Sequence, residues 1–160
     1  MKTIMGIDQS LTSTGIVIVN GIDVIHSEVI SSIKTDNTYK RITDISIRCL
    51  DLANKFKPND IVIEGLAFGS FGKATRDLAG LHFVIASLLL LNQHKVHVIP
   101  PTQLKKLATG HGKASKKDMY ASLPSHIKDY FVNKKFKTTS GLYDVTDAYF
   151  LATCLAVSIT

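Results

Sequence analysis

The segment Met5-Gly6-Ile7-Asp8-Gln9-Ser10-Leu11-Thr12-Ser13-Thr14-Gly15-Ile16-Val17-Ile18-Val19 decides the fold, because it places one carboxylate inside an apolar run. The residues on both sides of Asp8 are too apolar for an exposed edge strand, so the run predicts a central strand. A carboxylate buried there is costly unless a cation or a hydrogen-bond donor meets it. Two roles are therefore open for Asp8: capping the turn at residues 10–14, or binding a metal ion together with carboxylates from elsewhere.

The composition indicates a single globular domain, residues 1–160. The chain is 45% hydrophobic and 20% charged, and its formal net charge of +6 favours a polyanion such as nucleic acid as partner. Its two cysteines form no CxxC pair, which argues against a structural zinc site or a disulfide framework and suggests a reducing, cytoplasmic location. No signal-peptide pattern is present, and the apolar run 83–91 is too short to span a bilayer, so we expect no membrane contact.

Hydrophobic periodicity predicts an α/β domain with a mixed five-stranded sheet flanked by helices. The predicted strands are 3–8, 14–20, 22–30, 60–64 and 96–99, and the first three form an antiparallel meander. The predicted helices are 38–57, 73–92, 103–108 after a Thr102 cap, one following a Ser115 cap, and 142–158. Asn20-Gly21 predicts a type I′ turn between the second and third strands. No element is predicted for 124–140.

The helix at 74–91 is apolar on most of its sides. Such a helix is either fully buried or shared with a partner chain. The sequence therefore predicts a homodimer that forms through this helix.

Four carboxylates stand out by their positions. Asp144 and Asp147 share one face in the first turn of the last helix, where the helix dipole alone could explain them. Asp8 and Glu64 are the other acids in strands that read as buried, and Glu64 ends its strand, where sites form in α/β sheets. Four such acids fit a site that holds two magnesium ions for phosphoryl transfer.

The chain resembles the RuvC family of Holliday-junction resolvases, because several of its short motifs match those of the family in order and spacing. The motifs are Gly6-Ile7-Asp8-Gln9-Ser10 with Thr14-Gly15, Ile63-Glu64, Lys105-Lys106 with Gly110-His111-Gly112, and Asp144-Val145-Thr146-Asp147-Ala148. The segment Glu64-Gly65-Leu66-Ala67-Phe68-Gly69 is most similar to phage-encoded members. The resemblance covers nearly the whole chain and is weakest over 124–140.

The resemblance implies an RNase H-like fold, a homodimer, and magnesium-dependent nicking of branched DNA: Holliday junctions, and also forks and replication intermediates. It implies that Asp8, Glu64, Asp144 and Asp147 are catalytic ligands of two Mg²⁺ ions, which Mn²⁺ should replace, with Asp8 bridging the two. Some members carry a histidine just after the last aspartate, where this chain has Tyr149 and Phe150, which leaves the metal pairing open.

Contacts to DNA are expected from basic and aromatic side chains. Lys105 and Lys116 align with basic residues that contact DNA in the family, and Phe68 lies near an aromatic that opens base stacking. The full expected set is Phe68, Phe71, Lys73, Lys105, Lys106, His111, Lys113, Lys116 and Lys117.

Two other classes of function stay open. One is a module that binds branched DNA without catalysis. The other is an ATP-binding domain of the actin and sugar-kinase type, which needs a glycine where this chain has Ser10.

A metal pair at His94 and His97 is disfavoured, because these strand side chains point to opposite faces.

Overall fold

The computed structural model describes residues 1–32, 37–67, 69 and 71–158, with side chains described as far as residue 155. Five strands within these residues form one sheet, in the order β3-β2-β1-β4-β5. The strands are β1 (Thr3–Asp8), β2 (Thr14–Asn20), β3 (Asp23–Ile30), β4 (Asp60–Glu64) and β5 (Val96–Ile99). β1, β2 and β3 are antiparallel neighbours, and β4 and β5 run parallel to β1. The predicted mixed sheet is confirmed.

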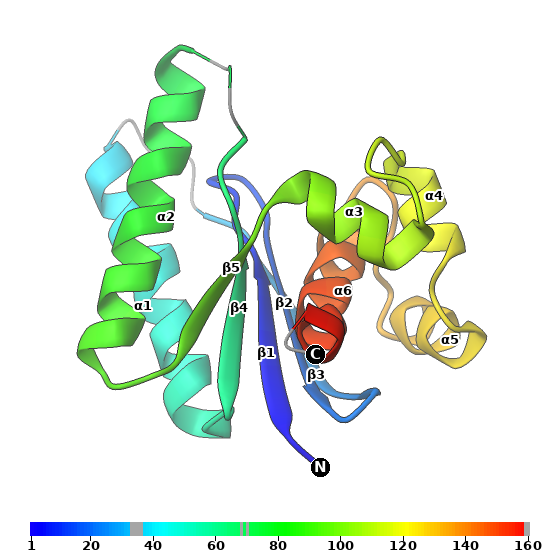
Figure 1. Cartoon of the computed structure of the whole chain (residues 1–160). Coiled ribbons are helices and arrows are strands. Elements are labelled where there is room, and N and C mark those ends of the chain that lie inside the picture. Colours follow the sequence, from blue (N-terminus) through cyan, green and yellow to red (C-terminus); the bar gives the residue numbers. More distant parts are fainter. Residues whose placement is uncertain (33–36, 68, 70, 159–160) are drawn as a thin grey trace.

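Helices cover both faces of the sheet (Figure 1). Those in the described part of the chain are α1 (Thr38–Phe56), α2 (Lys73–Leu91), α3 (Pro101–Thr109), α4 (Lys116–Ala121), α5 (Ser125–Asn133) and α6 (Leu142–Ser158). In Figure 1, α1 and α2 lie on one side of the sheet and α3 to α6 on the other. α5 occupies the region for which the sequence predicted no element.

The two central strands are apolar on both faces because each face has its own core. On one face, Met5 and Ile7 of β1 pack in a cluster with residues of α1 and α2. On the other face, Ile4 of β1 and Val17 of β2 pack in a cluster with residues of α6. This double burial explains the nearly continuous apolar run around Asp8.

α6 lies unusually close to the sheet because glycines face it. A Cβ added at Gly6 would overlap the backbone carbonyl oxygen of Ala148, and one added at Gly15 would overlap the backbone of Asp144. The helix backbone therefore rests directly on β1 and β2. This contact sets the first turn of α6 beside the end of β1.

Two local predictions need correction. Asn20 pairs with Asp23, so the two-residue turn is Gly21-Ile22, and only Gly21 has a positive φ, +69°. A type I′ turn needs positive φ at both central positions, whereas glycine at the first alone is the type II′ pattern. α3 begins at Pro101 without a Thr102 cap, because proline lacks the N–H that a first helical residue leaves unpaired.

The Ser115 cap is confirmed. Its Oγ accepts a hydrogen bond from the backbone N–H of Asp118 at 3.2 Å, and Asp118 Oδ2 accepts one from the backbone N–H of Ser115 at 2.8 Å. This reciprocal capping box fixes where α4 begins.

α2 has more apolar surface than the fold covers. Leu81, Ile85 and Leu89 are buried against α1 and the sheet, but Phe83 is 63% exposed and Leu91 is 80% exposed. Among the described helices, α2 is also long and apolar enough, by length and composition, to cross a membrane. A helix with this pattern has one side in the core and one side available to another surface.

We predict that Gly6→Ala destabilises the protein by about 1–3 kcal/mol, because its Cβ meets backbone that cannot move aside. Thermal unfolding followed by circular dichroism measures the change. Gly80→Ala in α2 is the matched control: its Cβ would lie 3.3 Å from the flexible Cδ1 of Ile42, and a helical glycine-to-alanine change should be neutral or stabilising. Equal melting temperatures for Gly6→Ala and wild type would contradict the close-packing argument.

Candidate active site

Asp8 and Glu64 are brought together by the parallel pairing of β1 and β4. The ladder between these strands ends at Ile7 and Ile63, so the next residues of both strands lie side by side just beyond it. The Asp8 and Glu64 side chains share a hydrogen bond. Two strand ends thus supply half of the acids that the sequence singled out.

The other two acids come from the start of α6. The close contact of this helix with Gly15 places Asp144 near the strand ends, where its Oδ2 accepts a hydrogen bond of 2.6 Å from Ser13 Oγ. Asp147 follows on the next turn. All four acids line one hollow of about 420 Å³, together with Lys105 of α3 and Lys116 of α4.

The electrostatics show a site with too much negative charge. Burial raises the pKa of Asp8 well above its ordinary value, and the neighbouring acids, Glu64 most of all, raise it further. Burial raises the pKa of Glu64 to about 7, with Asp147 adding to the effect. Burial also raises the pKa of Asp147 to about 6, although Lys116 lowers it. The two lysines do not offset the acids, so the hollow favours a further cation.

The donor set fits magnesium. All four acids offer carboxylate oxygens, the ligands that Mg²⁺ prefers. Among the described residues, no three His, Cys, Asp or Glu side chains form a preassembled metal cage. Magnesium does not require one, because it keeps several waters and takes one or two carboxylates together with substrate phosphate oxygens. Asp8, Glu64, Asp144 and Asp147 are the residues that could hold it.

The capping role for Asp8 finds no support. The turn after β1 is closed by its own residues: Thr14 Oγ1 donates to the Ser10 carbonyl oxygen at 2.6 Å and accepts from the Ser10 N–H at 3.1 Å. No bond from Asp8 to this turn is present in the described part of the chain.

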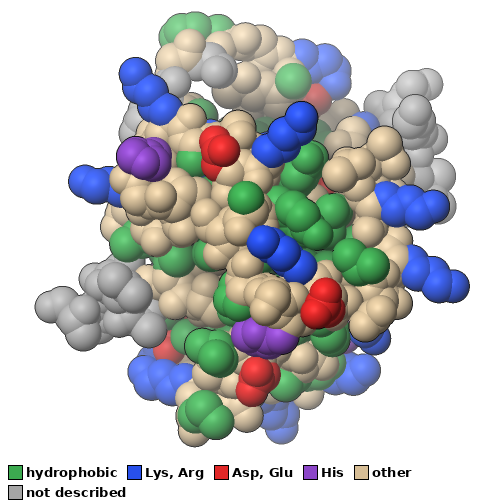
Figure 2. Space-filling view, turned by 90° about the vertical axis from the view of Figure 1, so that its right-hand side faces the viewer, with side chains coloured by type: hydrophobic (Ala, Val, Ile, Leu, Met, Phe, Trp, Pro, Cys, Tyr) green, Lys and Arg blue, Asp and Glu red, His purple; other side chains and the backbone are tan. Residues whose placement is uncertain are grey.

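The expected DNA-contacting residues fall into separate groups. Lys105 and Lys116 face the acids, whereas Lys106 and Lys117 are exposed on the outer sides of α3 and α4. Figure 2 shows the side of the molecule that lies to the right in Figure 1, where Lys and Arg side chains are spread over the surface and do not gather in one patch.

The remaining expected contacts lie farther out. His111 and Lys113 are exposed and line a second hollow of about 440 Å³ beside α4. Lys73 begins α2 and forms an ion pair of 2.6 Å with Asp77. Phe71 is 97% exposed, and Phe68 lies outside the described residues.

His94 and His97 do not form a metal pair. His97 Nε2 lies 2.8 Å from Asp60 Oδ1, and His94 Nε2 lies 3.0 Å from Asn54 Oδ1. Each ring therefore has its own partner, as the alternation of a strand predicts.

Three residues at the site were missed from the sequence: Gln9, Ser13 and His82. Gln9 and Ser13 both follow Asp8 in the segment quoted first, and Ser13 donates a hydrogen bond to Asp144. Their position was the available signal. His82 is buried on α2, and nothing in its local sequence connects it to β1.

Comparison with known proteins shows the family. The model for crossover junction endodeoxyribonuclease RuvC matches residues 4–154. The protein of that name from Bdellovibrio bacteriovorus is 30% identical over 153 residues, 93% of this chain and 86% of the relative. The one from Chlorobium phaeobacteroides is 24% identical, over 94% of this chain and 79% of the relative.

A solved structure shows the same fold. The structure of Thermus thermophilus RuvC in complex with a Holliday junction substrate matches with a TM-score of 0.76 at 20% identity. The match covers 99% of this chain and 95% of that one. The RNase H-like fold prediction is confirmed.

We predict that Asp8→Asn raises the melting temperature in metal-free buffer at pH 7, by about 2–4 °C for a gain of about 1 kcal/mol. The substitution removes a buried carboxyl whose charged form is disfavoured by burial and by the neighbouring acids. Magnesium should stabilise the wild type more than the variant. Scanning calorimetry with EDTA and with Mg²⁺ measures both effects, and a lower melting temperature for the metal-free variant would contradict this account.

Proposed function

Because the chain belongs to the RuvC family of crossover junction endodeoxyribonucleases, we propose that it is a magnesium-dependent endonuclease that nicks branched DNA by two-metal hydrolysis. Holliday junctions are the main proposed substrate, and forks and replication intermediates are others. The observation that carries the proposal is the convergence of four acids from β1, β4 and α6 in one hollow that two lysines face. A module that only binds DNA has no need of such a costly cluster.

The acids hold the metal ions in this proposal. Magnesium ions held by these acids would activate a water molecule as nucleophile and stabilise the leaving 3′ oxygen. Asp8, central among the acids, is proposed to ligate both ions, and Glu64, Asp144 and Asp147 to complete the two sets. Mn²⁺ should replace Mg²⁺, because both accept carboxylate oxygens.

The lysines hold the DNA. Lys105 and Lys116 line the hollow and lower the pKa of Glu64 and Asp147, so their charges act where a scissile phosphate must also enter. They are proposed to neutralise that phosphate. Lys73, Lys106, His111, Lys113 and Lys117 would contact more distant phosphates and so bind without reading sequence.

Dimerisation is proposed to use the exposed side of α2. Phe83 and Leu91 on this side would be covered by the same helix of a second copy. A two-fold interface would present two copies of the hollow to the two strands of a junction. Covering by a second copy would also explain why α2 is apolar on its exposed side.

We propose a cytoplasmic location for the protein, because its DNA substrate is found there.

The loop after β4 is proposed to open the junction. Phe71 is almost fully exposed, so its ring is available to stack on an unpaired base. Phe68 is closer in sequence to Glu64 and remains our first choice for the wedge, the ring that inserts between bases at the junction centre.

Membership of the phage-encoded branch of the family also stays a prediction.

We predict that Asp8→Asn abolishes magnesium-dependent nicking of a labelled four-way junction and leaves junction binding equal or tighter. The variant loses a metal ligand, while removing a negative charge near phosphate cannot weaken electrostatic attraction. Nicking assays and gel-shift titrations measure the two effects. Turnover of the variant at the wild-type rate would refute the assignment.

We predict that Phe83→Asp weakens self-association at least about tenfold, because it places a charge in the apolar interface. Tyr39→Asp on α1 is the control, since Tyr39 is 85% exposed on another helix. Light scattering across micromolar concentrations measures the dimer fraction. A wild-type monomer that resolves junctions at full rate would exclude the dimer, and partition of the wild type into neutral vesicles would favour a membrane role for α2.

We predict that Phe68→Ala slows nicking of a fully paired junction at least about tenfold, a barrier change of roughly 1.4 kcal/mol, without changing duplex binding. The defect should shrink on a junction whose centre is already unpaired, because the stacking that the ring replaces is then absent. Phe71→Ala serves as the comparison. Equal losses on both junctions would remove the wedge from the mechanism, and a collapse in melting temperature would show that the ring packs in the core.

A further inference from the structure

The strand ends that carry Asp8 and Glu64 are not paired directly with each other in the sheet. Their backbone ladder stops one residue earlier, at Ile7 and Ile63. Beyond that point the Asp8 and Glu64 side chains lie next to each other, with no backbone pairing between their two strands. Asp8 pairs with Gly15 of β2 and Glu64 pairs with Ile99 of β5, so each end is held on its outer side, and only a side-chain contact can join the two ends directly.

Gln9 supplies that contact. Its Nε2 donates a hydrogen bond of 2.6 Å to the backbone carbonyl oxygen of Glu64, which crosses the gap between β1 and β4. Gln9 is 7% exposed, so the bond is shielded from competing water. The tie joins the residue after Asp8 to the backbone of Glu64 itself.

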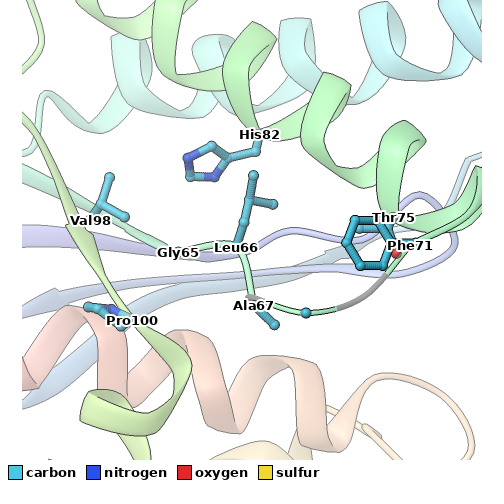
Figure 3. Close-up of a pocket in the computed structure, with 9 residues that line it drawn as sticks. Gly65, Leu66, Ala67, Phe71, Thr75, His82, Val98 and Pro100 are labelled. Atoms are coloured by element: carbon cyan, nitrogen blue, oxygen red, sulfur yellow. The ribbon is translucent and has the colours of Figure 1, made fainter.

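His82 of α2 holds Gln9 in turn. Its Nδ1 lies 3.1 Å from Gln9 Oε1, and its ring is buried. Figure 3 shows the ring extending from α2 toward the chain where Gly65 follows β4. A carbonyl oxygen can only accept, so Gln9 must present Nε2 to Glu64 and Oε1 to His82. With the amide in this orientation, His82 Nδ1 donates to Gln9 Oε1, and the His82 ring also forms a hydrogen bond with the backbone of Glu64.

We propose that Gln9 and His82 are positioning residues, a clamp that holds Asp8 and Glu64 at the spacing at which they bind metal. Gln9 also lines the hollow that holds the four acids, but both hydrogen bonds of its amide are used within the clamp, which acts through the two strand ends. It rests on the proposed function, because it deepens the account of the same site. Residues that support metal ligands in this way typically contribute 10- to 100-fold to metal affinity or activity.

Three substitutions test the clamp. His82→Phe keeps a ring but removes the donor, and Gln9→Met keeps the length but removes both hydrogen bonds. His82→Asn is the conservative variant, because its amide nitrogen can donate from the place of Nδ1. His94→Phe is the matched control, since His94 bonds to Asn54 far from the acids.

Two measurements separate positioning from folding. Mn²⁺ titration of the DNA-free protein, followed by electron paramagnetic resonance, gives metal affinity without any activity. The Mg²⁺ dependence of junction nicking gives the half-saturating concentration and the maximal rate. We expect His82→Phe and Gln9→Met to weaken Mn²⁺ binding about tenfold and to raise the half-saturating Mg²⁺ in proportion. Maximal rate should return largely at high Mg²⁺, and His82→Asn and His94→Phe should match the wild type.

The outcomes distinguish the clamp from the function. Unchanged Mn²⁺ affinity in His82→Phe and Gln9→Met overturns the clamp, and so does a lower maximal rate that high Mg²⁺ does not restore. If His82→Phe unfolds, Gln9→Met and His82→Asn still decide the matter through their Mn²⁺ affinities. A wild type that binds Mn²⁺ but nicks no branched DNA overturns the proposed function. The clamp is then still tested by the Mn²⁺ affinities of the variants.

Discussion

The contact between α6 and the two central strands is the constraint on which the site depends. Glycines at positions 6 and 15 let the helix backbone approach to a distance that no side chain would allow. Without that approach, Asp144 and Asp147 would stand farther from Asp8, and the hollow would lose half of its acids. The same contact buries β1 and β2 on their second face. Core packing and site assembly therefore depend on the same two glycines.

The site is held in a state that the metal-free protein does not favour. Burial and mutual repulsion raise the pKa of Asp8, Glu64 and Asp147. Lys105 and Lys116 neutralise only part of the negative charge of the acids. The rest of the fold must be stable enough to hold these acids close together. Two large cores, one on each face of the sheet, supply that stability. Strain of this kind is expected at functional sites, where a bound cation or substrate relieves it.

The sequence predicted the strands and the acids for a physical reason: both are local signals. An aspartate inside an apolar run, or a glutamate at a strand end, is visible without knowing its neighbours. The turn at Gly21 was mispredicted because the register of pairing, which selects the central residues, is set by the whole hairpin. α5 was missed because the stretch 124–140 is polar and basic as a whole, with Lys134, Lys135 and Lys137 following the helix. Only the tertiary core shows that Ile127 and Phe131 share a buried side. His82 was missed because its partner Gln9 lies 73 residues away.

α2 contacts both the core and the strand ends that carry the acids, although these parts are far apart in the sequence. Its inner side carries Leu81 and Ile85 into the core, and His82 reaches toward the strand ends beside them. The next residue, Phe83, packs edge-on against the His82 ring, with centroids 5.3 Å apart, and also faces outward. A surface that covers Phe83 would restrict the His82 ring from behind. If the cover is a second copy of the chain, assembly and the geometry of the acids are linked through one pair of neighbouring rings, and metal affinity should rise as the dimer forms.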